Sequence, residues 1–145
     1  MRIRVRLALA ALSVVVAGAA VGQDDPIKAR QALMQSNGDA SKVAFDMVRG
    51  TTPFDAAAAS AAMLTIASNM EALPTLFPEG SDQGKTKASP AIWQNKDAFN
   101  ALAAKLATDA KAASEAAANG LEALKTAFGA VGGDCGACHQ QFRNQ

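Results

Sequence analysis

A regular spacing of apolar residues near the C-terminal end strongly constrains what this chain can fold into. From residue 121 to residue 142, apolar residues and cysteines recur at alternating intervals of three and four. That spacing predicts a helix with one continuous face buried against other helices, as in a helical bundle. The face comprises Leu121, Leu124, Phe128, Val131, Cys135, Cys138 and Phe142. Both cysteines therefore face the predicted core, and a group bound to them would lie inside the fold.

The two cysteines belong to the motif Cys135-Gly136-Ala137-Cys138-His139. C-x-x-C-H is the attachment signature of c-type haem. Each cysteine sulfur forms a thioether with one vinyl group of the porphyrin, and the adjacent histidine ligates the iron. His139 is the only histidine in the sequence, so we expect it to be the proximal ligand, and bis-histidine coordination within one chain is excluded. The motif predicts one haem c, attached covalently through two thioethers.

Two other uses of a Cys-x-x-Cys pair agree less well with the sequence. A thiol–disulfide exchange motif normally opens a helix that follows a strand, and no segment of this chain reads as a strand. A structural zinc site needs four ligands, whereas the chain offers two cysteines and one histidine. Haem attachment is therefore favoured over both alternatives.

Four glycines interrupt the same predicted helix, at positions 129, 132, 133 and 136. Each weakens a helix by about 1 kcal/mol relative to alanine. Their presence favours a flat, bulky group that approaches the helix backbone closely. We therefore predict that the haem occupies the bundle core and replaces side chains as packing volume.

The first 22 residues have the three-part composition of a secretory signal peptide. Arg2, Arg4 and Arg6 precede an apolar run over 7–16, and small residues lie before a predicted cleavage site at Gln23. A membrane anchor is the alternative, but the apolar run is shorter than the roughly 20 residues that a spanning helix needs. Export agrees with C-x-x-C-H, because bacteria attach c-type haem outside the cytoplasm. We predict a periplasmic protein with no membrane anchor after cleavage.

The predicted mature chain, residues 23–145, has the length of one domain. Removal of the signal peptide takes away three arginines and no acidic residue, which leaves 11 basic and 13 acidic residues and a formal net charge of −2. A near-neutral chain without a basic run lacks the electrostatic footprint of a nucleic-acid-binding protein.

Capping and turn signals divide this domain into four predicted helices. The first spans about 26–49, the second starts at 52 or 55 and ends near 73, and the third spans about 89–118, with a break near 95 as an alternative. Two prolines and two glycines predict an irregular segment over 74–89. With the fourth helix, these predict an all-α fold, an antiparallel up-down-up-down four-helix bundle with covalently attached haem.

Taken together, these features resemble class II c-type cytochromes, the family of cytochrome c' and its low-spin relatives. The resemblance covers nearly the whole mature chain. Its most specific part is the haem motif near the C-terminus, because class I cytochromes carry theirs near the N-terminus. The residues that carry it are Arg30-Gln31 with Met34, 50–57 (Gly-Thr-Thr-Pro-Phe-Asp-Ala-Ala), 73–78 (Leu-Pro-Thr-Leu-Phe-Pro), 90–93 (Pro-Ala-Ile-Trp), the haem motif and Phe142-Arg143.

The resemblance implies roles for several polar residues. Arg30 and Gln31 would contact the haem propionates, with Thr86 as a further candidate. A propionate partner would explain an arginine on a core-facing stripe; without one, its side chain is expected to extend to the rim of the bundle. Arg143 resembles a basic residue near the proximal imidazole, where it would tune ligand basicity. The resemblance also implies a homodimer through the first two helices.

The family divides at the position of Met34, one helical turn after Arg30. In the low-spin branch a methionine here ligates the iron, which gives a six-coordinate electron carrier that serves redox partner proteins. In the cytochrome c' branch an apolar residue leaves the iron five-coordinate, and nitric oxide or carbon monoxide can bind. We predict ligation by Met34, with the five-coordinate gas-binding protein as the alternative. The methionines at 47, 63 and 70 are predicted to be core.

An enzyme is a third class, and the sequence disfavours it. The chain lacks a distal histidine or a paired catalytic acid for peroxide cleavage, and a Ser/His/Asp arrangement would need His139, which the haem would occupy. We expect haem binding and electron transfer.

Overall fold

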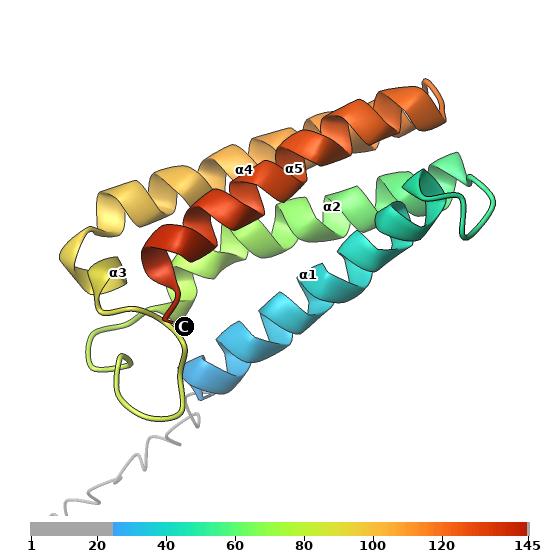
Figure 1. Ribbon diagram of the computed structural model, residues 1–145. Coiled ribbons are helices and arrows are strands. Elements are labelled where there is room, and N and C mark those ends of the chain that lie inside the picture. Colours follow the sequence, from blue (N-terminus) through green and yellow to red (C-terminus); the bar gives the residue numbers. More distant parts are fainter. Residues whose placement is uncertain (1–24, 145) are drawn as a thin grey trace, which may run out of the picture.

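Four long helices, each antiparallel to the next, form the fold of residues 25–144, which are the residues that this computed structural model describes (Figure 1). They are α1 (Pro26–Val48), α2 (Ala56–Ala72), α4 (Lys96–Ala117) and α5 (Leu121–Phe142). A 3-10 helix, η1 (Leu73–Leu76), and a short helix, α3 (Ala91–Gln94), lie between α2 and α4. The predicted up-down-up-down bundle is confirmed. The predicted signal peptide lies outside the described residues.

The helix starts follow the capping residues in the sequence. The Asp25 carboxylate accepts hydrogen bonds from the backbone N–H groups of Ile27 (3.0 Å) and Lys28 (3.3 Å). Asp55 accepts one from Ala58 N (3.0 Å), so α2 begins after Asp55, the later of the two predicted starts. These bonds satisfy backbone donors that have no partner within the first turn of a helix.

Between α2 and α4 the structure departs from the predicted helix boundaries at two points. The predicted third helix is interrupted at Asn95, whose backbone dihedrals (φ −141°, ψ 59°) separate α3 from α4. The alternative prediction of a break near 95 is therefore confirmed. The predicted irregular segment begins with the regular 3-10 turn η1. Pro74 lies in the first turn of η1, where a missing N–H costs no hydrogen bond. The irregular part is therefore shorter, and we call residues 77–90 the loop.

The core lies mainly between α2, α4 and α5, with many alanines that let the helices approach closely. Its largest fully buried side chains are Met63, Ile66, Leu73, Ile92, Leu124 and Val131. At the loop end, the rings of Phe77 and Phe99 meet edge to face (4.8 Å between centroids), as do those of Phe99 and Phe142 (5.4 Å). None of the helices in residues 25–144 is long and apolar enough to cross a membrane.

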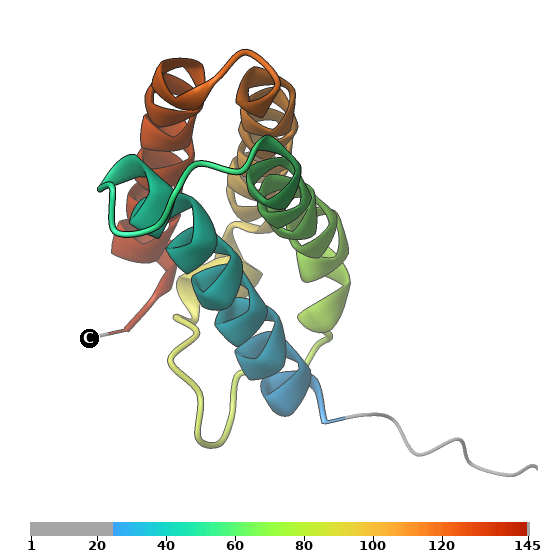
Figure 2. The same cartoon turned by 90° about the vertical axis from the view of Figure 1, so that its right-hand side faces the viewer.

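Backbone hydrogen bonds tie the end of α5 to the loop. Ser89 N donates to Phe142 O (2.9 Å), and Asn144 N donates to Lys87 O (2.8 Å). The loop therefore lies at the same end of the bundle as the start of α1 and the end of α5 (Figures 1 and 2). This arrangement places loop residues beside the helix that carries the Cys-x-x-Cys-His motif.

Candidate haem site

A cavity of about 850 Å³ lies between α1, α5 and the loop, with further walls from α2 and α4. Its volume falls within the range of cofactor pockets. The seven residues predicted to bind the haem or its iron all line it, although they come from three separate segments: Arg30, Gln31, Met34, Thr86, Cys135, Cys138 and His139. The fold thus brings the predicted site residues together.

The cysteines and the histidine share the α5 wall of this cavity. Burial raises the pKa of the Cys135 thiol, and the nearby Asp134 carboxylate adds to that rise. The pKa of Cys138 is raised too, mainly by burial. A thiol–disulfide exchange site has the opposite property, a stabilised thiolate. Burial, together with the positive charge of Arg143, lowers the pKa of His139, which favours the neutral imidazole that coordinates a metal.

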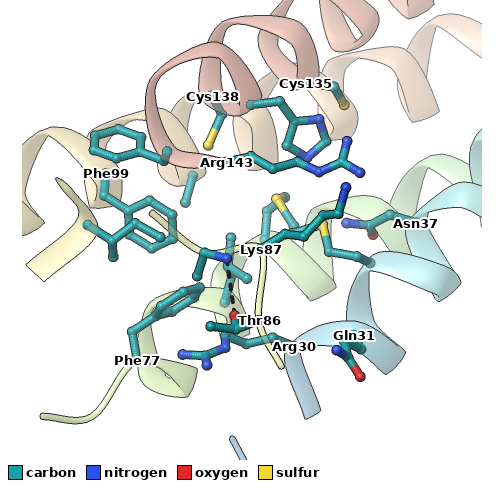
Figure 3. Close-up of a pocket in the computed structure, with 18 of the residues that line it drawn as sticks. Arg30, Gln31, Asn37, Phe77, Thr86, Lys87, Phe99, Cys135, Cys138 and Arg143 are labelled. Carbon is teal, nitrogen blue, oxygen red and sulfur yellow. Dashed lines mark hydrogen bonds between the residues drawn. The ribbon is translucent and has the colours of Figure 1, made fainter. Parts of the chain in front are cut away.

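Arg30 on α1 does not extend to the rim of the bundle, as an arginine without a partner was expected to do. Its side chain is buried (5% exposed). Nη1 donates to Leu76 O (3.3 Å) and to Ser81 Oγ (3.1 Å), and Nη2 donates to Ser81 O (2.7 Å). The guanidinium also lies over the Phe77 ring, 4.6 Å from its centroid. Arg30 therefore fixes the start of the loop against α1, and Figure 3 shows its guanidinium beside Phe77.

One donor of Arg30 is left over from these contacts. Its Nε is buried and has no hydrogen-bond partner among residues 25–144. A buried, unpaired N–H is costly, and a carboxylate of a group in the cavity would satisfy it. This unpaired donor fits the propionate contact that the resemblance implied.

Gln31 and Thr86 also line the cavity, and both already bond to the loop backbone. Gln31 Nε2 donates to Lys85 O (3.1 Å), and Thr86 Oγ1 accepts from Ala88 N (3.1 Å). The Thr86 hydroxyl proton is free to donate, since this bond uses only its oxygen. Both residues order the loop beside the cavity.

Two methionines line the cavity, rather than one. Met34 on α1 is 37% exposed, whereas Met70 on α2 is buried (3% exposed). The prediction that the methionines at 47, 63 and 70 belong to the core is confirmed. The spacing of seven between Met63 and Met70 predicted their shared buried face. It did not show that this face borders a cavity at Met70.

The proposal that the α5 glycines allow close approach of the haem stays a prediction. None of the four glycines at 129, 132, 133 and 136 lines the cavity. A methyl group added at any of them would meet no atom within 4 Å. Gly132 and Gly136 precede His139 by seven and three residues, so they lie on the same stripe of α5 as His139, one residue round from the cysteines.

Sequence reasoning also missed several polar residues on the cavity wall, among them Asn37 and Lys85. Asn37 lies one turn after Met34, a spacing that already placed it on the same face of α1. Lys85 lines the cavity from the loop, as does Lys87, whose charge makes it, like Thr86, a candidate to meet an anion. Lys85 carried no usable signal, because the loop has no periodicity that assigns its side chains to a side.

The cavity suits a large, mainly apolar group with carboxylates and a metal centre. It offers two adjacent thiols for covalent attachment, a neutral imidazole, two thioether sulfurs and an unpaired arginine donor. Fold and site together define a haem-binding four-helix bundle with covalently attached haem.

Comparison with known proteins identifies the family. The family model for cytochrome c' matches residues 25–143. The chain is 42% identical over 117 residues to cytochrome c-556 of Agrobacterium fabrum, which covers 81% of this chain and 80% of that protein. The structure of cytochrome c' from Rhodopseudomonas palustris superposes with a TM-score of 0.80 at 38% identity, covering 85% of this chain and 98% of that one.

A more distant relative was solved with a ligand. It is the nitric oxide complex of a mutant cytochrome c' from Alcaligenes xylosoxidans, with a TM-score of 0.75 at 28% identity, covering 84% of this chain and 96% of that one. The chain belongs to the cytochrome c' family, whose members are haem proteins and not enzymes. Its cofactor is covalently attached haem c.

Proposed function

We propose that this protein is an electron carrier whose haem iron is held between His139 and Met34. The observation that carries the proposal is the placement of these residues on separate walls of one cavity, His139 on α5 and Met34 on α1. Cys135 and Cys138 would form the two thioethers from the same wall as His139. The test is the absorption spectrum of the oxidised, haem-loaded protein, which distinguishes sulfur ligation from an open sixth position.

The side chains around the cavity have separable tasks in this proposal. Haem supplies one-electron oxidation and reduction of iron, and its axial ligands set the potential. Arg30 Nε, with Gln31 and Thr86, would meet the propionates. Arg143 lies close enough to His139 to lower its pKa, and it would tune the basicity of that ligand. The remaining lining is mostly apolar and would limit the access of water to the iron.

Replacing Arg30 by alanine is expected to destabilise the haem-loaded protein by about 3 kcal/mol. The change removes three hydrogen bonds from a charged donor and leaves Leu76 O and Ser81 O without them, and such losses cost about 1–3 kcal/mol each without adding fully. Urea unfolding measures the effect. Arg49→Ala is the matched control, because Arg49 is an exposed arginine at the end of α1. Equal urea midpoints for the two variants would show that the Arg30 hydrogen bonds do not stabilise the protein.

The reduction potential of the same variants tests the contact between Arg30 and a haem propionate. Loss of the Arg30 charge should lower the reduction potential and change its dependence on pH, because a cation beside a propionate disfavours the oxidised, more positive iron. Arg30→Lys keeps the charge but not the fork of donors. A potential that is the same in Arg30→Ala and Arg49→Ala would remove Arg30 from the propionate site.

The alternative function is gas binding at a five-coordinate iron. Two observations favour it as the second candidate: Met34 is partly exposed and so is not locked by packing, and a relative of the family was solved with nitric oxide. In this alternative the proximal side is unchanged, and Met34 lines the distal side without binding iron.

We further propose that the protein acts in the periplasm after removal of residues 1–22. The support is the composition of that segment together with the haem motif. Mass spectrometry of protein recovered from a periplasmic extract tests it, and a mature chain that retains residue 1 would contradict the cleavage.

A homodimer through α1 and α2 is the third proposal. Val43 on α1 and Leu64 on α2 are large apolar side chains left 39% and 50% exposed, and a shallow groove lined by Val43 and several alanines separates the two helices. Leu64→Glu is expected to shift the protein to monomers in sedimentation equilibrium, because a charge would be buried in the interface. Thr108→Glu, on the exposed face of α4, is the control. A monomeric unsubstituted protein would refute the dimer.

A further inference from the structure

Asn37 is a polar residue on the α1 wall of the cavity, one turn beyond Met34. Asn69 on α2 holds its side chain: Asn69 Nδ2 donates to Asn37 Oδ1 (2.8 Å) and to Ser36 Oγ (3.0 Å). These bonds bridge α1 and α2 beside the cavity. They fix the Asn37 amide in one orientation, with its carbonyl oxygen turned to Asn69.

The amide nitrogen of Asn37 is not used by this bridge. Among residues 25–144, Asn37 Nδ2 donates no hydrogen bond, while its oxygen is engaged. Figure 3 shows the Asn37 amide on the α1 side of the pocket, across from Cys135 and Arg143. The few polar groups of a mainly apolar pocket orient the ligand that binds there. Gln35 and Ser41 lie on the same wall, and among residues 25–144 neither accepts a hydrogen bond from Asn37.

We propose that Asn37 is a hydrogen-bond donor to a diatomic ligand with a partly negative terminal oxygen, bound on the Met34 side of the haem. The proposal rests on haem binding in this cavity and goes beyond the proposed electron transfer. The donors of a distal pocket decide which ligands an iron centre accepts. Met34 and Asn37 therefore have opposite effects on the binding of this ligand. The Met34 thioether occupies the iron site, and the Asn37 amide stabilises a ligand that displaces the thioether.

The test uses haem-loaded protein that carries Met34→Leu, which leaves the Met34 side of the haem open to carbon monoxide. The result therefore does not depend on whether Met34 ligates the iron in the unsubstituted protein. Reduced protein is saturated with carbon monoxide, and the carbon–oxygen stretch is recorded by infrared spectroscopy. A donor at the terminal oxygen weakens that bond. Adding Asn37→Leu or the near-isosteric Asn37→Asp should move the stretch to higher wavenumber. Carbon monoxide should also dissociate about five-fold faster, the equivalent of one neutral hydrogen bond.

Two further variants separate a directed donor from general polarity. Asn69→Ala leaves the Asn37 amide present but free to rotate, so the band should broaden or split. Ser41→Ala removes another polar group of the same wall and should leave the band in place. A band that is unchanged in both Asn37 variants overturns the proposal. Failure of Met34 ligation is read separately, from the spin state of the unsubstituted oxidised protein, so the two results remain distinguishable.

Discussion

Haem-loaded protein with His139→Ala is expected to keep its haem through denaturation but to lose the iron ligand on the α5 side. The thioethers to Cys135 and Cys138 would be untouched, while no second histidine exists in the sequence to take over. The absorption spectrum should therefore change from that of a centre with an imidazole ligand to that of a weakly ligated, high-spin iron. This is the largest spectral effect that we expect of a single substitution.

Free imidazole gives this prediction a positive control. It should enter the space left by the missing side chain and restore the original bands. Gln140→Ala, at the exposed neighbouring position, should leave the spectrum unchanged. If His139→Ala and Gln140→Ala gave the same spectrum as the unsubstituted protein, His139 would not be the ligand.

Met34→Leu is expected to convert a six-coordinate, low-spin centre into a five-coordinate, high-spin one. Leucine and methionine have similar volumes, so the fold should lose less than about 1.5 kcal/mol, while the iron loses a thioether ligand. The reduction potential should fall, since methionine ligation raises it. Reduced protein should then bind carbon monoxide without having to displace a ligand. Spin state and carbon monoxide titration measure the change.

Met70→Leu is the matched control for this substitution. Met70 lines the same cavity from α2 but is buried in the core. Met70→Leu therefore removes the other thioether sulfur that lines this cavity. The proposal predicts that Met70→Leu retains the low-spin spectrum. A loss of the low-spin spectrum in Met70→Leu alone would assign the sulfur ligand to α2 instead.

The helices and the attachment side of the site were predictable because each depends on local pattern. The alternation of three and four along α5 predicted both its buried face and the inward position of the cysteines. The predicted start of the first helix at 26 is confirmed, with Asp25 as its cap, and the second helix begins after Asp55, the later of its two predicted starts. In these segments the residues that make the helix also decide which way its side chains face.

The loop and its contacts could not be predicted in the same way. Two of the three hydrogen-bond partners of Arg30 are backbone oxygens, those of Leu76 and Ser81. Every residue has a backbone carbonyl group, so residue type does not predict which one will accept a hydrogen bond. The same holds for the bonds from Ser89 to Phe142 and from Asn144 to Lys87, which any residue other than proline could make. Sequence reasoning therefore predicted a buried arginine only through a family resemblance.

Arg30 connects the two halves of the site. From α1 it fixes the start of the loop, and the far end of the loop pairs with the end of α5 just beyond His139. The wall that carries Met34 and the wall that carries His139 are thus both hydrogen-bonded to the loop, one at each end of it.

The most direct test of ligation by His139 and Met34 is the absorption spectrum of the oxidised, haem-loaded protein from the visible to the near infrared. Sulfur bound to ferric haem gives a weak charge-transfer band at the red end of the visible range. We predict this band, with sharp low-spin bands after reduction, and we predict that the red band disappears in Met34→Leu. A broad high-spin spectrum without the red band would contradict ligation by Met34 and would make gas binding at an open iron the function of this protein.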